Sequence, residues 1–382
     1  VLMRGIFKVG KKSHDVLLTR TRLTWTPIIP ESPTGQLPWE QLLCCSKCVV
    51  LLQDVFAVKV KRRRMAGQQS GGAVLGLALF HSRRRGRRLE EDTLHLHNAS
   101  AEHTHSWYNT LKELLTGFSC RPRYVKVFIN PSSHKKEAVH IYRDHVAPLF
   151  KMADILTDIT GSTDVVSCSV HGVRDPVTAA LHVVLGHLQQ VDMCSFLSNG
   201  QLMRFGFSAM FGFGGRSLAR AEKKRWMPSS RRREYAVVKT LSWVTNQGLY
   251  LSLSIMSIPC LSPHAPQGLA PNTSLDNGSA SLIAVGNASR SEFIKHLKRY
   301  SSSSGQFSFP FVETHSVSAV KIRPRSRIGW SEEEKGAALP WNIDGELVEI
   351  ANEVLIRVHP RLITLYGEEV PEAELTVTCS CI

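Results

Sequence analysis

The stretch YVKVFINP, residues 124–131, combines β-branched and aromatic residues with an Asn-Pro ending. Such a run predicts a buried strand that leads directly into a turn. A helix is predicted next, within residues 134–153, because apolar residues recur there at helical spacing, at Ala138, Ile141, Tyr142, Val146 and Leu149. A strand, a loop and a helix in this order predict the beginning of an open α/β layer.

The sequence before this stretch, residues 1–118, alternates apolar and polar positions in short bursts, as in 5–9, 56–60 and 74–80. A period of two predicts a small antiparallel sheet. One helix is predicted to cover it, because an apolar stripe follows at Trp107, Leu111, Leu114, Leu115 and Phe118. Strands closed by a Trp-containing C-terminal helix resemble a pleckstrin-homology domain. The alternative is a small β-domain with a core tryptophan and no lipid site.

The sequence after about residue 190 is richer in strands. Strand candidates include residues 202–207, 249–258, 281–285, 316–322 and 355–358, and two helical interruptions are predicted at 216–225 and 291–300. This part is expected to form a β-rich lobe.

Positive charge is the main compositional signal, because 47 Lys and Arg residues oppose 32 Asp and Glu residues and leave a net charge of +15. The cations are concentrated in two runs, Lys59, Lys61, Arg62, Arg63 and Arg64, and then Arg83, Arg84, Arg85, Arg87 and Arg88. Phosphoinositide headgroups, acidic membranes and nucleic acid all bind such clusters. A solvated strand edge or a nuclear import signal are the alternatives.

The chain is expected to be globular and to lie in the cytosol or nucleus. No stretch approaches the roughly 18 to 20 apolar residues that cross a bilayer, and the first residues lack the layout of a secretory signal. Nine irregularly spaced cysteines indicate reduced thiols. Cys45 and Cys48 form a Cys-x-x-Cys spacing without a second pair, so no metal site is predicted.

Several separate motifs together resemble the ceramide kinase and diacylglycerol kinase family, most closely its ceramide kinase-like branch. They are FINP at 128–131, GSTD at 161–164, RFGF at 204–207 with Gly212, Gly214 and Gly215, EKKRW at 222–226, GLAP at 268–271, LDNG at 275–278, residues 307–313, and WNIDGE at 341–346. The resemblance extends from about residue 2 to residue 366.

The resemblance implies roles for individual residues. Asp344 would be the candidate base toward a lipid hydroxyl, although an Asp-Gly pair is also common in ordinary turns. Nucleotide binding would involve Asn130, Ser133, His134, Lys135, Gly161, Ser162, Thr163, Gly345 and Glu346. Lipid headgroups would contact Lys61, Arg62, Arg63, Arg64, Arg83, Arg84 and Arg85. An active enzyme would need ATP and Mg²⁺, and an inactive one would need no cofactor.

One part of the family pattern is missing from this chain. The family has a glycine pair after the Asn-Pro turn and then Gly-Gly-Asp-Gly in further βα units, which would occupy on the order of sixty residues. Here SSHKK stands at 132–136, and residues 156–160 run directly into Gly161. Such a gap is typical of exon skipping and predicts a shortened splice form. Glycine-rich turns cradle phosphates in this chemistry, so catalysis is expected to be impaired. The loss of strands is also expected to uncover apolar helix faces.

An α+β multidomain fold is therefore expected. Its parts are an N-terminal pleckstrin-homology-like β-domain with a C-terminal helix (1–118), a truncated α/β nucleotide-binding lobe (122–190), a C-terminal β-rich lobe of the lipid-kinase fold (191–366) and a divergent tail (367–382).

The favoured function is that of an impaired lipid kinase that regulates sphingolipid-related processes by binding membrane lipid or a partner. Anionic membrane lipids, phosphoinositides and ceramide are the expected ligands, and the chain is expected at endomembranes or, through its basic runs, in the nucleus. The first alternative is an active ATP- and Mg²⁺-dependent kinase of ceramide or a related lipid. The second is a nucleic-acid-binding protein that uses the arginine runs, although no reader fold accompanies them.

Overall fold

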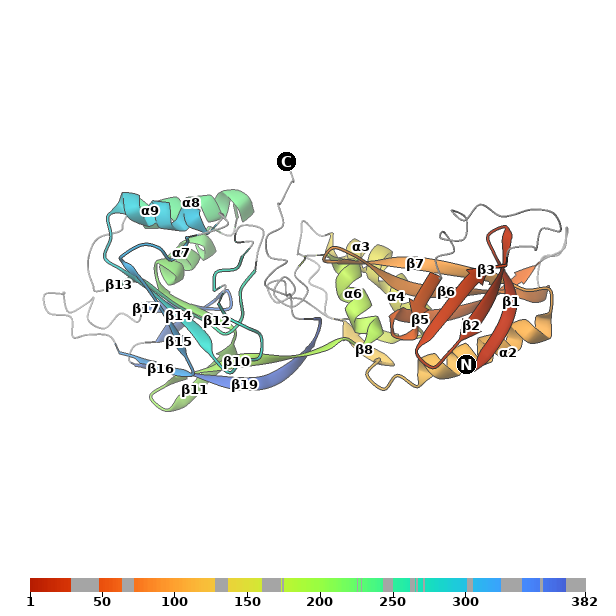
Figure 1. Cartoon of the computed structure of the whole chain (residues 1–382). Coiled ribbons are helices and arrows are strands. Elements are labelled where there is room, and N and C mark those ends of the chain that lie inside the picture. The colour runs from red at the N-terminus through yellow and green to blue at the C-terminus, as the bar shows by residue number, and fades with distance from the viewer. Residues whose placement is uncertain are drawn as a thin grey trace, which may run out of the picture. The chain divides into compact units, whose positions relative to one another are not determined.

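The computed structural model describes residues 1–28, 48–63, 72–127, 137–159, 173, 175–224, 226–227, 229–242, 250–261, 265, 267–270, 272–300, 305–323, 339–350 and 353–368. The chain divides into two compact units (Figure 1). The first comprises Val1–Thr163 with Val173–His187, and the second comprises Asp164–Gly172 with Leu188–Ile382. The predicted α+β class is confirmed, and the domain boundary expected near residues 118–122 falls inside the first unit.

The first unit is built on a seven-stranded antiparallel sheet with the order β4-β3-β2-β1-β7-β6-β5. Its strands are β1 (Met3–Val9), β2 (Lys12–Leu18), β3 (Arg22–Pro27), β4 (Cys48–Leu51), β5 (Val55–Arg63), β6 (Ala73–Arg85) and β7 (Arg88–His97), with the short 3-10 helix η1 (Leu52–Asp54) before β5. Burial alternates along β2, as the period-two sequence pattern predicts.

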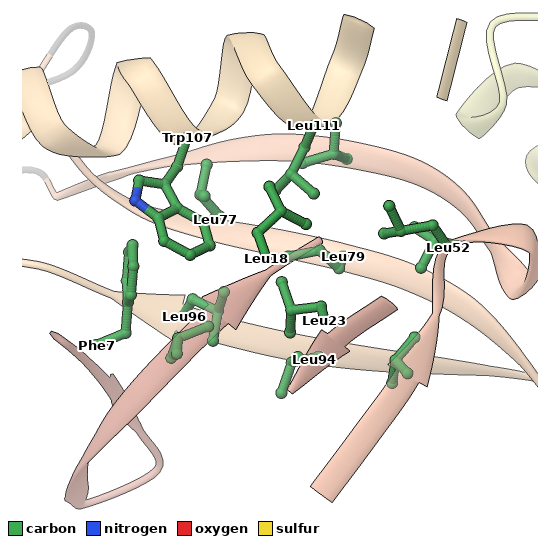
Figure 2. Close-up of a cluster of buried hydrophobic side chains, with 14 residues drawn as sticks. Phe7, Leu18, Leu23, Leu52, Leu77, Leu79, Leu94, Leu96, Trp107 and Leu111 are labelled. Carbon is green, nitrogen blue, oxygen red and sulfur yellow. The ribbon is translucent and has the colours of Figure 1, made fainter. Parts of the chain in front are cut away.

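Helix α2 (Ala101–Thr116) covers one face of this sheet (Figure 1). Ser100 caps its first turn by accepting a hydrogen bond from the N–H of His103 at 3.2 Å. Trp107 and Leu111 are fully buried against strand residues such as Phe7, whose ring lies edge-on to the indole with the centroids 4.9 Å apart (Figure 2). The predicted covering helix and its apolar stripe are confirmed.

The segment after α2 continues in the same unit. Strands β8 (Tyr124–Val127) and β9 (Leu156–Ile159) pair in parallel, separated by helix α3 (Ala138–Ile141), the π-helical turn η3 (Tyr142–Val146) and helix α4 (Ala147–Met152). Helix α6 (Pro176–Leu185) follows and ends at Gly186, whose φ is +74°. A Cβ on this glycine would lie 2.6 Å from the carbonyl oxygen of Cys120, so only glycine fits.

These helices pack on the face of the sheet that α2 leaves open. Phe80 alternates with Leu79 along β6; Leu79 belongs to the core under α2, and Phe80 contacts the second cluster. That cluster, called here the outer-face cluster, consists of Phe56, Ala57, Leu89, Leu149, Phe150, Ile155, Ala180, Leu181, Val184 and Leu185. The apolar faces of α4 and α6 are therefore covered, although the shortened sequence predicted uncovered helices.

Polar groups at this contact are also paired. The buried hydroxyl of Thr178 accepts a hydrogen bond from the N–H of Leu89 at 3.0 Å and donates to Asp175 at 2.7 Å. Arg121 donates to the carbonyl oxygens of Val55 and Gln53 at 2.7 and 2.8 Å. Burial lowers the pKa of Arg121 to about 10, and its guanidinium still carries a charge at neutral pH.

The second unit contains two antiparallel sheets. One has the order β11-β10-β19-β16 and the other β15-β14-β13-β12-β17-β18. The strands are β10 (Leu188–Ser198), β11 (Gln201–Gly206), β12 (Ser208–Gly212), β13 (Tyr250–Met256), β14 (Ala280–Gly286), β15 (Val312–Val317), β16 (Ala319–Ile322), β17 (Leu339–Ile343), β18 (Glu346–Ile350) and β19 (Val354–Tyr366). The helices are α7 (Phe213–Glu222), α8 (Ser229–Ser242) and α9 (Arg290–Arg299). Four of the five predicted strands and both predicted helices are confirmed. The strand predicted at 316–322 is divided between β15 and β16, which belong to different sheets, and α8 was not predicted.

Truncating Leu181 to alanine tests the outer-face cluster. The side chain is fully buried, so Leu181→Ala should lower the free energy of unfolding of the first unit by about 2–5 kcal/mol. Urea unfolding followed by tryptophan fluorescence measures this loss. The matched control is Val139→Ala on the exposed side of α3, for which a change within about 0.5 kcal/mol is expected. Equal effects of the two substitutions would contradict the packing of α6.

His296 makes the stability of the second unit depend on pH. Burial lowers its pKa, against the weaker opposing effect of the Gln306 carbonyl, which lies 3.1 Å from Nδ1. The neutral ring is favoured in the folded state, so this stabilisation is complete above the unfolded pKa of about 6.5 and is lost as pH falls from there through the folded pKa. Chemical unfolding at several pH values should show a shallower pH dependence for His296→Gln than for the unmodified chain. An unchanged slope would exclude this role.

Candidate functional site

Asp344 and Gly345 form the two-residue turn between β17 and β18. Both residues have positive φ, +48° and +87°, as a type I′ hairpin requires. The side-chain oxygen of Asn342 accepts a hydrogen bond from the N–H of Gly345 at 2.9 Å and fixes the turn from inside the strand. The ordinary-turn interpretation therefore describes the backbone of this pair correctly.

The carboxylate of Asp344, however, accepts hydrogen bonds that the turn itself does not require. Its Oδ2 accepts the N–H of Phe207 at 2.8 Å, and its Oδ1 accepts both the N–H and the hydroxyl of Ser208, at 2.8 and 2.9 Å. A Cβ at Gly206 would lie 2.6 Å from Oδ2, so glycine is needed for this approach. The RFGF motif and the DGE motif therefore build one site.

Three donors to one carboxylate fix its orientation. Each carboxylate oxygen can accept about two hydrogen bonds, so Oδ2 retains one acceptor position. Asp344 is exposed, and that position could receive a hydroxyl group or a metal-bound water. The arrangement can orient a polar ligand, but it does not itself supply phosphate-binding groups.

Glu346 lies at the start of β18 and is already paired. Its Oε2 lies 2.6 Å from Nη1 of Arg204 on β11, with 71% of the Glu346 side chain exposed. An exposed pair of this kind contributes little stability. Its effect at the site is to direct Glu346 toward Arg204.

Most residues predicted to bind nucleotide lie outside the described residues. These are Asn130, Ser133, His134, Lys135, Gly161, Ser162 and Thr163. Of that predicted set, the structure brings together Gly345 and Glu346 with the candidate base Asp344, all in the second unit. Among the predicted lipid-headgroup residues, Arg64 and the side chain of Arg63 are also outside the described part.

The two basic runs lie at opposite ends of the β5–β6 hairpin. Lys61 pairs with Gly76 and Arg62 with Val74 near the start of β6, whereas Arg83 to Arg85 lie beyond the point where Val55 pairs with His81. Nine residues from Val74 to Arg83 correspond to about 30 Å of strand. The structure therefore does not combine the two predicted basic runs into one surface.

The Arg83–Arg85 run faces acidic residues on β7. Arg83 and Arg85 each lie 3.9 Å from a carboxylate, that of Asp92 and that of Glu90 respectively. These long, exposed contacts are weak, but they reduce the local positive charge.

The other basic end of the sheet contains lysines that the sequence reasoning did not select. The strand register aligns Lys8 with His97, His97 with Gly76, and Gly76 with Lys61 across β1, β7, β6 and β5. Three strand spacings, roughly 14 Å, separate Lys8 from Lys61. The exposed residues Lys11 and Lys12 lie at the same end, where β1 turns into β2. The sequence KVGKK, residues 8–12, has three lysines around a glycine turn and was the signal from which this basic end could have been predicted.

This basic end, defined as Lys8, Lys11, Lys12, Lys61 and Arg62, has few polar partners among the described residues. Nζ of Lys61 lies 3.3 Å from Nε2 of His95. Burial and the nearby charge of Lys61 lower the pKa of His95 and favour its neutral ring. Arg62 donates to the carbonyl oxygen of Gly72 at 3.2 Å. No carboxylate forms an ion pair with these five cations in the part of the chain that the structure describes.

Comparison with known proteins places these motifs in one family. The model of the ceramide kinase C-terminal domain matches residues 207–244 and 241–382. The chain is 38% identical to the ceramide kinase-like protein of Homo sapiens, over 97% of this chain and 91% of the relative. That alignment is 511 positions long while this chain has 382 residues, so more than a hundred positions of the relative face gaps here.

More distant similarities were also found. Ceramide kinase of Mus musculus is 23% identical over 72% of this chain and 80% of its own length. A solved structure of a diacylglycerol kinase from Bacillus anthracis str. Sterne gives a TM-score of 0.34 at 12% identity, covering 64% of this chain and 76% of that one. Identity to the human protein over almost the whole chain shows that this protein belongs to the ceramide kinase-like protein family.

Proposed function

We propose that this chain is a ceramide kinase-like family member that binds anionic membrane lipid through its first unit and does not transfer phosphate. The observation that supports this most strongly is the basic end of the first sheet. Five cations gather there from β1, the β1–β2 turn, β2 and β5, without a carboxylate partner among the described residues.

Several features support membrane lipid as the ligand. Each Lys or Arg near an anionic bilayer contributes about 1 kcal/mol of attraction, so a cluster of five is sufficient for peripheral binding. The seven-stranded sheet with its covering helix is also what a pleckstrin-homology-like domain requires. Phosphoinositides are the expected ligands, and the proposed location is the cytoplasmic face of endomembranes.

The proposed membrane contact is peripheral and does not involve a helix that crosses the bilayer. Within the residues that the structure describes, none of the helices has both the length and the apolar character that crossing a bilayer requires. We also propose that the two basic runs act as a nuclear import signal.

The absence of phosphate transfer is proposed from the nucleotide side of the reaction. Phosphoryl transfer depends mainly on positioned phosphates and charge neutralisation, and a general base alone contributes about 10²- to 10⁴-fold. The described residues do not fit ATP and Mg²⁺ at Asp344, because Phe207 and Ser208 leave its carboxylate a single free acceptor position and Glu346 is already paired with Arg204. The family's Gly-Gly-Asp-Gly segment does not occur in the sequence.

A kinase assay tests the catalytic part of this proposal. The full chain, shown to be folded by circular dichroism, is given labelled ATP and Mg²⁺ with ceramide, diacylglycerol or sphingosine. No labelled lipid is expected, either from the unmodified chain or from Asp344→Asn, because the sequence lacks the Gly-Gly-Asp-Gly segment whose N–H groups would bind the phosphates. Turnover that disappears in Asp344→Asn would show instead an active lipid kinase with Asp344 as its base.

Vesicle binding tests the lipid part. Replacing three cations of the basic end, as Lys8→Gln, Lys12→Gln and Arg62→Gln together, should weaken binding to phosphoinositide-containing vesicles on the order of 100-fold, since each charge contributes about 1 kcal/mol. The charge-matched control replaces Arg83, Arg84 and Arg85 with glutamine, and a smaller loss is expected because Glu90 and Asp92 face that run.

The same proteins are compared on single-stranded RNA at matched salt concentrations. Tight RNA binding that exceeds vesicle binding and depends on the arginine run would favour the nucleic-acid alternative. Equal losses of vesicle binding in the two triple variants would contradict the assignment to the basic end.

A further inference from the structure

Helix α7 of the second unit presents two arginines one turn apart. Arg216 and Arg220 are four residues apart, a spacing that places them side by side on a helix. The helix packs on β12, β17 and β18 and lies beside α8 (Figure 1). Phe213, Ser217 and Arg220 share the helix face that Phe213 buries against Phe293, with the ring centroids 5.0 Å apart.

Two polar atoms on this face lack a partner among the described residues. Nη1 of Arg220 and the hydroxyl of Ser217 are buried and form no hydrogen bond with any of them. Neither Arg216 nor Arg220 forms an ion pair with a carboxylate in the described part of the second unit. Buried donors that remain unpaired are unfavourable, so a protein that keeps them commonly uses them for a ligand.

The two guanidinium groups also repel each other. Partial burial, followed by the charge of Arg220, lowers the pKa of Arg216, although Arg216 remains accessible to solvent. Among the residues that the structure describes, two neighbouring cations and a hydroxyl therefore have no compensating anion. A dianion between them would relieve the repulsion and pair the unpaired donors.

We propose that Arg216, Ser217 and Arg220 form a binding site for a phosphomonoester group. A guanidinium presents its donors in a planar fork that matches two phosphate oxygens, and a serine hydroxyl can donate to a third. The surrounding surface would also attract an anion, because Lys223 and Lys224 follow on the chain. Nζ of Lys224 lies 5.8 Å from the ring centroid of the exposed Trp226.

This site is independent of the proposed membrane contact. It lies in the second unit, whereas the basic end belongs to the first, and separate variants remove them. The phosphate could belong to a lipid headgroup or to a free phosphate compound, so both sources need to be tested.

Thermal unfolding of the full chain with and without pyrophosphate tests the site. The test variant is Arg216→Gln with Arg220→Gln; the charge-matched control is Lys295→Gln with Arg357→Gln, both exposed in the same unit. Pyrophosphate should raise the unfolding midpoint of the unmodified chain and of the control by a few degrees, and should not raise that of the test variant. Without pyrophosphate, the test variant should unfold at the same or a higher temperature, since the repulsion is gone.

Two results would overturn the proposal. One is equal stabilisation of all three proteins by pyrophosphate, or stabilisation of none at millimolar concentration. The other is a lower midpoint of the test variant without pyrophosphate together with an unchanged pyrophosphate response, which would show a structural role for the arginines.

Vesicle flotation then identifies the source of the phosphate. The comparison is between phosphatidic acid and phosphatidylserine vesicles of equal surface charge. Loss of a preference for phosphatidic acid in the test variant identifies a lipid phosphomonoester. An unchanged vesicle preference combined with a lost pyrophosphate response identifies a free phosphate compound.

Discussion

The outer-face cluster, in which α4 and α6 pack against β5 and β7, is the contact on which the first unit depends. Two short helices and a two-stranded parallel sheet bury too little apolar surface to be stable alone. Against the seven-stranded sheet they bury side chains such as Phe150 and Leu181 completely or nearly so. The bonds from Leu89 to Thr178 and from Arg121 to the η1–β5 segment pair the polar groups at the contact. Residues 137–159 and 175–187 thus fold as part of the first unit.

Much of this fold could be predicted from local sequence pattern. The alternation at 202–207 and 281–285 predicted β11 and β14 within one or two residues, and the stripe through Trp107 and Leu111 predicted α2. The helix α8 could not be predicted this way, because its arginine-rich beginning hides the apolar face that buries Ala236.

The arrangement of charge could not be predicted, because it depends on strand register. The pairing of β1 with β7 brings Lys8 into line with Lys61, although about fifty residues of sequence separate them. The short turn at Gly86 sets Arg83 and Arg85 near Asp92 and Glu90. Local composition showed two similar basic runs. The structure shows that Arg83 and Arg85 face carboxylates and that Lys59 pairs with Asp154, whereas Lys61 and Arg62 form no ion pair with a described carboxylate.

In the candidate site, too, the motifs indicated which residues are present but not how they interact. The DGE and RFGF motifs were selected separately as parts of the family resemblance, and the structure joins them through the carboxylate of Asp344. What the motifs could not show is that Phe207 and Ser208 donate three hydrogen bonds to this carboxylate and that Glu346 pairs with Arg204. The absence of Gly-Gly-Asp-Gly from the sequence, together with this arrangement at Asp344, supports the proposal that the protein binds lipid without modifying it.

Native-state hydrogen exchange with and without MgATP tests this account most directly, because it reports on folding and on nucleotide binding together. The account predicts that amides of α6 exchange as slowly as those of β6, since one cluster holds both, and that MgATP leaves protection unchanged around Asp344 and along β8 and β9. Fast exchange of α6 beside a protected β6, or slower exchange at Asp344 on addition of MgATP, would contradict it.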